Sequence, residues 1–265
     1  MCLGLLFATL VCSAAWHTQQ QNCDVMGKLS KGARWCRVVV QMRASLVALR
    51  KALAGEVGFS APLEALAAAL FNGQLPAAWA RLNPETQKSL GAWMVWFARR
   101  HAQYEQWVAR GEPAAMWLAG LHAPATYLAA LVQAACRQQG WPLDKSTLYT
   151  RVTKVTRADA IRERPRCGCY VQGLFLEGAG WDAERAELAR QAPKVLVTEL
   201  PVLEIIPVEA SKLRLANTFR APVYVTQARR DAMGKGLVFE ADLATREHPS
   251  HWVLQGVALS LNTAV

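Results

Sequence analysis

The first half of the chain alternates apolar and polar residues with the period of an α-helix. From Val39 to Leu53 apolar residues recur every three or four positions, and basic residues lie between them. A second apolar repeat follows Ser60, a residue type that caps helices, and it stops at Asn72-Gly73. These two segments predict a short helical hairpin.

Two further helices are expected before residue 140. Asn83-Pro84-Glu85 has the form of a helix start, because a proline in the first turn loses no hydrogen bond. The helical repeat then continues to about Arg110, and Gly111 and Pro113 are expected to end it. Pro124 to Arg137 predicts another helix with one apolar side.

Beyond Gly140 the pattern becomes typical of β-structure. β-Branched and aromatic residues are more frequent, and glycine and proline divide the chain into short runs. The expected strands are Thr147 to Val155, Tyr170 to Glu177, Val202 to Ile206, Pro222 to Thr226, Leu237 to Asp242 and Trp252 to Leu261. Helices followed by strands predict an α+β fold with segregated halves and a boundary within residues 138–146.

Composition supports a globular protein. Of 265 residues, 52% are apolar and 19% are charged, which excludes a disordered tail and a multi-span membrane protein. A net charge of +10 favours acidic partners. The densest basic groups, Arg99-Arg100 and Arg157 to Arg166, match no nucleic-acid-binding motif. We therefore expect solvated basic residues and neither nucleic acid nor membrane as a partner.

The cysteines and the start of the chain indicate no disulfide framework and no metal. Seven cysteines are an odd number, and Cys167-Gly-Cys169 lacks a second pair at the spacing of a zinc site. The apolar run from Met1 to Ala15 is too short to span a bilayer and has no preceding basic stretch. A secretion signal is therefore the weaker explanation of this run.

No motif indicates catalysis or a cofactor. A P-loop is absent, and Gly234-Lys235-Gly236 is expected to be a tight turn between strands. His248 and His251 have no third metal ligand nearby. Glu177 is expected to end a strand and Asp182 to cap the next segment. The sequence predicts no enzyme, no cofactor and no metal.

Ten tryptophans are many for this length, and most should lie in the core. Trp93 and Trp96 are three residues apart and are not expected to be equally buried, so one of them would contribute to an exposed docking patch. The candidate docking or structural residues are Trp93, Trp96, Trp107, Trp117, Trp181 and Trp252.

Several motifs occur in the order found in one protein family. The main ones are Leu90-Gly91-Ala92-Trp93, Trp117 to Leu121, Gly173 to Ala179 and His251 to Leu259. From about residue 37 to its end, the chain resembles the C-terminal region of dynein heavy chains. Met233 to Leu243 looks axonemal, of the outer-arm gamma type. The sequence departs from the family at Ala119, where serine is usual, and in residues 1–36. Because the resemblance begins only after them, residues 1–36 are expected to be a poorly ordered or artificial leader, with a secretion signal as the alternative.

The resemblance implies a helical subdomain, residues 37–140, followed by an antiparallel β-barrel-like subdomain, residues 141–265. It implies a non-catalytic cap that docks in cis on the AAA+ ring of a dynein heavy chain, braces it and supports minus-end-directed motility. The ATPase modules would lie upstream of this chain.

Other dynein chains would be further partners, and the microtubule only an indirect one. The location would be the cytoplasm and cytoskeleton, in the ciliary axoneme. The alternative is a free-standing basic adaptor that binds acidic surfaces such as tubulin.

Overall fold

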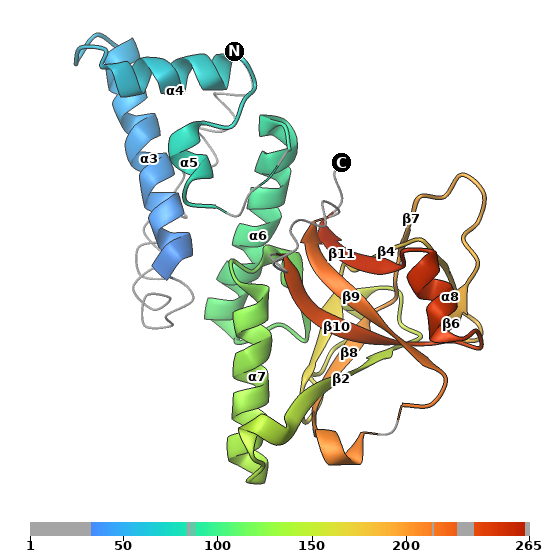
Figure 1. The fold of residues 1–265 in the computed structure, drawn as a ribbon. Helices are drawn as coiled ribbons and strands as arrows, with labels where there is room; N and C mark the ends of the chain where they lie inside the picture. The colour runs from blue at the N-terminus through green and yellow to red at the C-terminus, as the bar shows by residue number, and fades with distance from the viewer. Residues whose placement is uncertain (1–32, 84–85, 87, 214, 227–235, 263–265) are drawn as a thin grey trace. The chain divides into compact units, whose positions relative to one another are not determined.

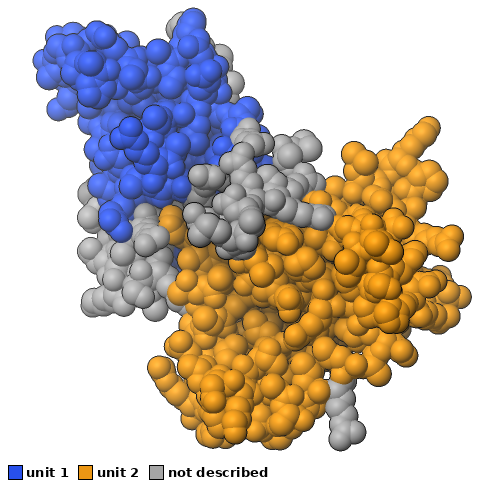
Figure 2. Space-filling view, viewed as in Figure 1, with its two compact units in different colours: residues 1–111, 265 blue, residues 112–264 orange. Residues whose placement is uncertain are grey.

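The computed structural model describes residues 33–83, 86, 88–213, 215–226 and 236–262. The chain forms two compact units, which Figure 2 distinguishes by colour. Unit 1 extends to Gly111, and unit 2 runs from Glu112 to Ala264. None of the described helices combines the length and the hydropathy needed to cross a bilayer.

Unit 1 is helical, as predicted. Its helices are α3 (Ala33–Leu53), α4 (Ala61–Phe71), α5 (Ala77–Ala80) and α6 (Leu90–Arg110), labelled in Figure 1. α3 contacts α4 and α5 and buries an apolar stripe that includes Val39, Met42 and Leu49. Ser60 precedes α4, but its side chain makes no capping hydrogen bond, and its carbonyl accepts from the backbone of Leu63 and Glu64 instead.

The start of α6 differs from the prediction. The helix begins at Leu90, where the Ser89 hydroxyl accepts a hydrogen bond from the backbone N–H of Ala92 (3.4 Å). Asn83 instead closes α5, since its side-chain amide donates to the carbonyl of Trp79 (2.9 Å). Pro84 and Glu85 lie outside the described residues. The predicted end, with Gly111 after Arg110, is confirmed.

Among its described residues, unit 2 contains the strands and two α-helices. Its elements are β1 (Ala115–Trp117), α7 (Pro124–Gln139), β2 (Ser146–Val152), β3 (Cys169–Gln172), β4 (Phe175–Glu177), β5 (Gly180–Asp182), β6 (Glu187–Ala189), β7 (Val197–Glu199), β8 (Leu203–Glu209), β9 (Thr218–Thr226), β10 (Leu237–Ala244), α8 (Pro249–Leu254) and β11 (Ala258–Asn262). Short 3-10 helices span Leu118–Gly120, Leu143–Lys145, Ala158–Ala160 and Ala210–Lys212. α7 confirms the predicted helix and packs against β2, β8 and β10.

The strands form two mixed sheets and a hairpin. One sheet has the order β1-β3-β8-β2, the other β10-β9-β11-β4-β7, and β5 pairs with β6. The α+β class is confirmed, but the all-antiparallel arrangement is wrong, because β1 and β3 are parallel and so are β9 and β11. The parallel β1–β3 pair is possible because a long crossover that contains α7 separates these two strands.

The predicted barrel-like closure is also absent from the described residues. β2 and β10 are the edge strands of their sheets and contact each other, but no backbone ladder joins them there. The carboxylate of Asp242 on β10 instead accepts from the backbone N–H of Thr150 on β2 (3.1 Å), and the Thr150 hydroxyl contacts the Asp242 backbone. A side chain thus takes the place of a ladder partner.

Two predicted strands have different forms. Tyr170 to Glu177 is divided into β3 and β4, which belong to different sheets. Trp252 lies in α8 rather than in a strand, and only the later part of the predicted segment is β11. Pro249 in the first turn of α8 and His248 at its N-cap, accepting from the N–H of Ser250, account for this helix.

The boundary between the two compact units lies earlier in the chain than the change from helices to strands. Strands begin to dominate after α7, within the expected residues 138–146, but α7 already belongs to unit 2. The unit boundary precedes α7 because β1, which comes before α7 in the chain, joins the sheet of β3, β8 and β2.

Candidate functional site

The interior of unit 1 is a cluster of aromatic rings on α5 and α6. Trp79 and Trp93 are completely buried, with ring centroids 6.3 Å apart, and Phe97 stacks on Trp93 at 4.9 Å. The indole N–H of Trp79 donates to the hydroxyl of Ser45 on α3 (3.0 Å). Trp93 is therefore a core residue that joins α6 to α5.

Arg100 lies in this interior and not on the solvated surface that the sequence predicted. Its side chain is completely buried, its Nη1 donates to Oδ1 of Asn83 (3.2 Å), and its guanidinium lies over the rings of Trp96 (5.0 Å) and Tyr104 (5.9 Å). Burial lowers the pKa of Arg100, and Tyr104 opposes that effect. The buried guanidinium therefore links α6 to Asn83, which follows α5.

Trp96 and Trp107 lie at the edge of the buried face of α6. Both are half-buried, and Trp107 stacks on Tyr104 at 6.4 Å. The expectation that Trp93 and Trp96 are unequally buried is met, with Trp96 the more accessible of the two. Nearby, burial lowers the pKa of His101, while Glu105, 3.3 Å away, raises it.

Unit 2 contains a partly buried polar cluster around Glu112, in which Tyr127 and Cys169 are buried, Glu112 is half-buried and Arg164 is exposed. The Tyr127 hydroxyl on α7 donates to one carboxylate oxygen of Glu112, and Arg164 pairs with the other at 2.7 Å. Burial raises the pKa of Tyr127 and that of the Cys169 thiol, the latter to about 12. A buried, protonated thiol is a weak nucleophile and metal ligand, so the cluster is suited to holding α7 against β3.

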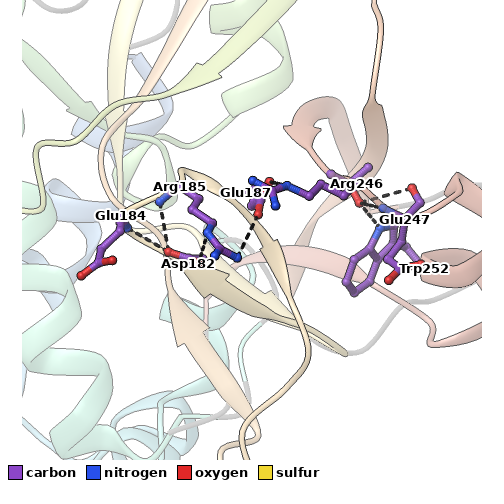
Figure 3. Close-up of polar contacts among 8 residues, drawn as sticks. Asp182, Glu184, Arg185, Glu187, Arg246, Glu247 and Trp252 are labelled. Carbon is purple, nitrogen blue, oxygen red and sulfur yellow. Dashed lines mark hydrogen bonds and ion pairs between the residues drawn. The ribbon is translucent and has the colours of Figure 1, made fainter.

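A second polar network connects the β5–β6 hairpin to the segment before α8 (Figure 3). The Asp182 carboxylate accepts from the backbone N–H groups of Glu184 and Arg185, both at 3.0 Å, which confirms its predicted capping role. Glu187 on β6 accepts from Nε of Arg246 at 2.9 Å and lies 3.9 Å from Arg185. Glu177 ends β4, also as predicted.

The remaining candidate tryptophans differ in burial. Trp117 and Trp252 are buried and Trp181 is half-buried. The indole N–H of Trp252, a residue labelled in Figure 3, donates to the Thr245 hydroxyl (2.6 Å), so this ring anchors α8 to the end of β10. The accessible residues of α8 are its neighbours Val253 and Leu254, which are 65% and 86% exposed.

Exposed apolar side chains offer a different set of docking candidates. The large ones are Val40, Leu53, Val57, Phe59, Phe71 and Val95 in unit 1, and Leu143, Val195, Leu196, Leu215, Leu237, Val253 and Leu254 in unit 2. Sequence reasoning missed them because an apolar residue on a helix or strand is expected to face the core. The available signal was two neighbouring apolar residues at the end of a helical repeat, such as Leu70 and Phe71, because adjacent residues on a helix cannot both face the same side.

The other chemical candidates are not brought together. Within the described residues no three His, Cys, Asp or Glu side chains form a group that could hold a metal. His248 contacts the Ser250 hydroxyl at 2.7 Å, and His251 packs edge-on against Trp252. Gly234 and Lys235 of the predicted turn lie outside the described residues.

Comparison with known proteins gives one family. The family model for the C-terminal domain of dynein heavy chains matches residues 30–261. The match begins slightly before residue 37, where the sequence resemblance was expected to start.

Curated relatives are similar over most of the chain. It is 66% identical over 229 residues, 86% of the chain, to "Dynein-1-alpha heavy chain, flagellar inner arm I1 complex" of Chlamydomonas reinhardtii. It is 59% identical over 230 residues, 87% of the chain, to "Dynein axonemal heavy chain 10" of Homo sapiens. It is 36% identical over 239 residues, 90% of the chain, to "Dynein beta chain, flagellar outer arm" of Chlamydomonas reinhardtii. The chain spans 5% of the length of each.

Proposed function

The chain belongs to the family formed by the C-terminal domain of dynein heavy chains, and we propose that it acts as this region of an axonemal heavy chain. The observation that carries this proposal is the 66% identity to an axonemal heavy chain over 86% of the chain. Its location would then be the cytoskeleton of the ciliary or flagellar axoneme. We keep the outer-arm gamma subtype as a prediction, although the higher identity to an inner-arm relative does not favour it.

The proposed role is mechanical. The chain docks on the AAA+ ring of its own heavy chain and braces it during minus-end-directed movement, with other dynein chains as further partners and the microtubule as an indirect one. The exposed apolar residues of both units, such as Phe71 and Leu254, support docking, because large apolar side chains at the surface favour burial in an interface. The missing P-loop supports placing ATP hydrolysis elsewhere in the heavy chain.

Three sequence-based assignments remain part of the proposal. They are residues 1–36 as a leader, residues 37–140 as a helical subdomain and residues 141–265 as a β-subdomain, although α3 begins at Ala33 and the compact units divide after Gly111. Among the tryptophans, we favour half-buried Trp96, Trp107 and Trp181 for docking, and buried Trp93, Trp117 and Trp252 for support of the fold.

Deletion tests the mechanical role. A recombinant axonemal heavy chain that lacks the region equivalent to residues 37–265 should still bind ATP, because the ATPase modules remain. Its microtubule-gliding velocity or its ATPase coupling should change, because the brace is gone. Unchanged gliding and unchanged microtubule-stimulated ATPase would refute the role.

A binding assay tests the non-catalytic assignment. The purified 265-residue chain should give no fluorescence change with a fluorescent ATP analogue, with the ring fragment of the heavy chain as the positive control. Saturable micromolar binding to the 265-residue chain alone would contradict the assignment.

Family membership does not favour the free-standing basic adaptor. That alternative predicts that the protein cosediments with microtubules at low salt and is released at high salt, because contacts between exposed charges are screened.

A further inference from the structure

Helix α3 has a buried face and an exposed face. Val38, Val39, Met42 and Leu49 are buried within unit 1. The exposed positions of the same helix include Arg37, Val40, Arg43, Ala44, Arg50 and Lys51. Because all of them lie on one continuous 21-residue helix, their relative positions are fixed by helix geometry.

The exposed face has the spacing of a helix-packing seam. Val40, Ala44 and Val47 are separated by four and then three residues, which aligns them along the helix. Val40 is 50% exposed, Ala44 is exposed and Val47 is half-buried. The small side chain of Ala44 at the middle would let a second helix approach closely.

Basic residues border this seam, because Arg37 and Lys51 continue its row at the two ends and Arg50 lies at one side, and no acidic residue occurs anywhere in α3. Residues 33–111 contain ten Lys and Arg, four Glu and no Asp. Arg50 and Lys51 stabilise the C-terminal end of the helix dipole, but Arg37 lies near its N-terminal end, where a positive charge is unfavourable. Helix stability alone therefore does not account for the charge.

We propose that the seam of α3, formed by Val40, Ala44 and Val47 and bordered by Arg37, Arg50 and Lys51, docks an acidic amphipathic helix. The apolar stripe of that helix would cover the seam, carboxylates near the two ends of the stripe would pair with Arg37 and Lys51, and one at its edge would pair with Arg50. The proposal deepens the proposed function, since it gives the partner chemistry of one surface of unit 1.

The acidic helix comes from another protein segment. The net charge of this chain is +10, and residues 1–32 contain one Asp and two Lys, so this segment has no excess negative charge. A second copy would present an equally basic face, and two such faces repel each other.

A protein helix fits this face better than a membrane or nucleic acid does. Residues 37–53 contain no aromatic side chain that could anchor at a lipid interface or stack on a base. A narrow seam of valine and alanine is instead the surface that a neighbouring helix covers.

The test measures binding of a designed peptide to the whole chain. The probe is a fluorescent helical peptide with leucine and alanine at its seam positions and glutamate at its flanks. The triple variant Arg37→Glu, Arg50→Glu, Lys51→Glu should bind it at least about tenfold more weakly by anisotropy. Val40→Asp should weaken binding separately, because it interrupts the apolar seam. Arg43 has another interaction within the protein and is left unchanged.

The matched control reverses three other exposed arginines, Arg110→Glu, Arg137→Glu and Arg190→Glu, and should keep wild-type affinity. An equal loss in this control, no probe binding by the wild-type chain, or full displacement of the probe by anionic vesicles or single-stranded DNA would overturn the proposal. Circular dichroism verifies that the variants are folded. Unchanged gliding after the deletion above would refute the mechanical role without altering these affinities, so the two failures are distinguishable.

Discussion

Thr245 lies between β10 and α8, and its hydroxyl accepts two hydrogen bonds. Thr245 is 3% exposed, and its oxygen accepts from the indole N–H of Trp252 (2.6 Å) and from the backbone N–H of Glu247 (3.1 Å). Both donors are drawn in Figure 3. A buried donor that loses its acceptor cannot form a hydrogen bond with water instead. Removing the Thr245 hydroxyl is therefore expected to lower the stability of the fold.

We predict that Thr245→Val lowers the free energy of unfolding by about 2 kcal/mol, because the side chain keeps its shape and loses only the hydrogen bonds. Thr245→Ser keeps the hydroxyl and should cost less than about 1 kcal/mol. Urea unfolding followed by tryptophan fluorescence measures both. Equal losses in the two variants would mean that the methyl group and not the hydroxyl stabilises α8.

Cys169 makes stability depend on pH in the alkaline range. Burial raises the pKa of its thiol from 9.0 to about 12 in the folded chain. The unfolded thiol ionises first, so the folded state retains a proton that the unfolded state has lost. The contribution is complete below pH 9 and decreases as the pH rises toward 12.

We predict that Cys169 alone lowers the free energy of unfolding by up to about 1.4 kcal/mol per pH unit above pH 9. Cys169→Ala should show a shallower slope, because it has no thiol to ionise. Urea unfolding at about pH 8, 9 and 10 compares the two proteins across the pKa of the unfolded thiol. The same slope in both would show that other groups determine the alkaline sensitivity.

At the scale of elements, the start of β3 depends on a close backbone approach. Gly168 immediately precedes the strand with φ +96°, and a Cβ placed there would lie 2.0 Å from the carbonyl oxygen of Ile205 on β8. Gly140, after α7, also has a positive φ of +70°, but a Cβ there would meet nothing within 4 Å. Comparing substitutions at the two glycines therefore separates the cost of a positive φ from the cost of a steric clash.

We predict that Gly140→Ala costs about 1 kcal/mol, since only the left-handed conformation is penalised. Gly168→Ala should cost more than about 3 kcal/mol, because β3 must also move away from β8. Thermal unfolding by circular dichroism measures the difference. Similar losses at both positions would contradict the close approach.

At the scale of the whole molecule, the packing boundary identifies which part of the protein should fold alone. Unit 2 begins at Glu112 and includes β1 and α7, although α7 belongs to the helical half of the sequence pattern. A fragment that begins at residue 141 would lose β1, the parallel neighbour of β3. It would also lose the buried α7 residues Tyr127 and Leu128.

We predict that residues 112–265 give a cooperative urea transition and a near-UV circular dichroism signal, because the contacts of β1 and α7 are retained. Residues 141–265 should give neither. A cooperative transition at the same midpoint in the shorter fragment would show that β1 and α7 do not support the sheets.

The sequence by itself determined the features that depend on neighbours along the chain. The helical repeats predicted α3, α4 and α7, and runs of β-branched residues predicted β2, β8 and β10, because such periodicities reflect one buried side of a local element. The ordered motifs were sufficient for the dynein resemblance. The absence of a P-loop was likewise evident from spacing alone.

Tertiary structure decided the features that depend on distant partners. Arg100 looked like a surface residue, and only the packing of α5 against α6 buries it beside Asn83 and Trp96. The three-residue strand β1 is too short for a pattern and exists because β3 is next to it. The resemblance implied one barrel, but the structure has two sheets, and the Asp242 carboxylate connects them by accepting a hydrogen bond from the backbone of Thr150. The sequence could not predict this contact, because Thr150 lies 92 positions earlier in the chain.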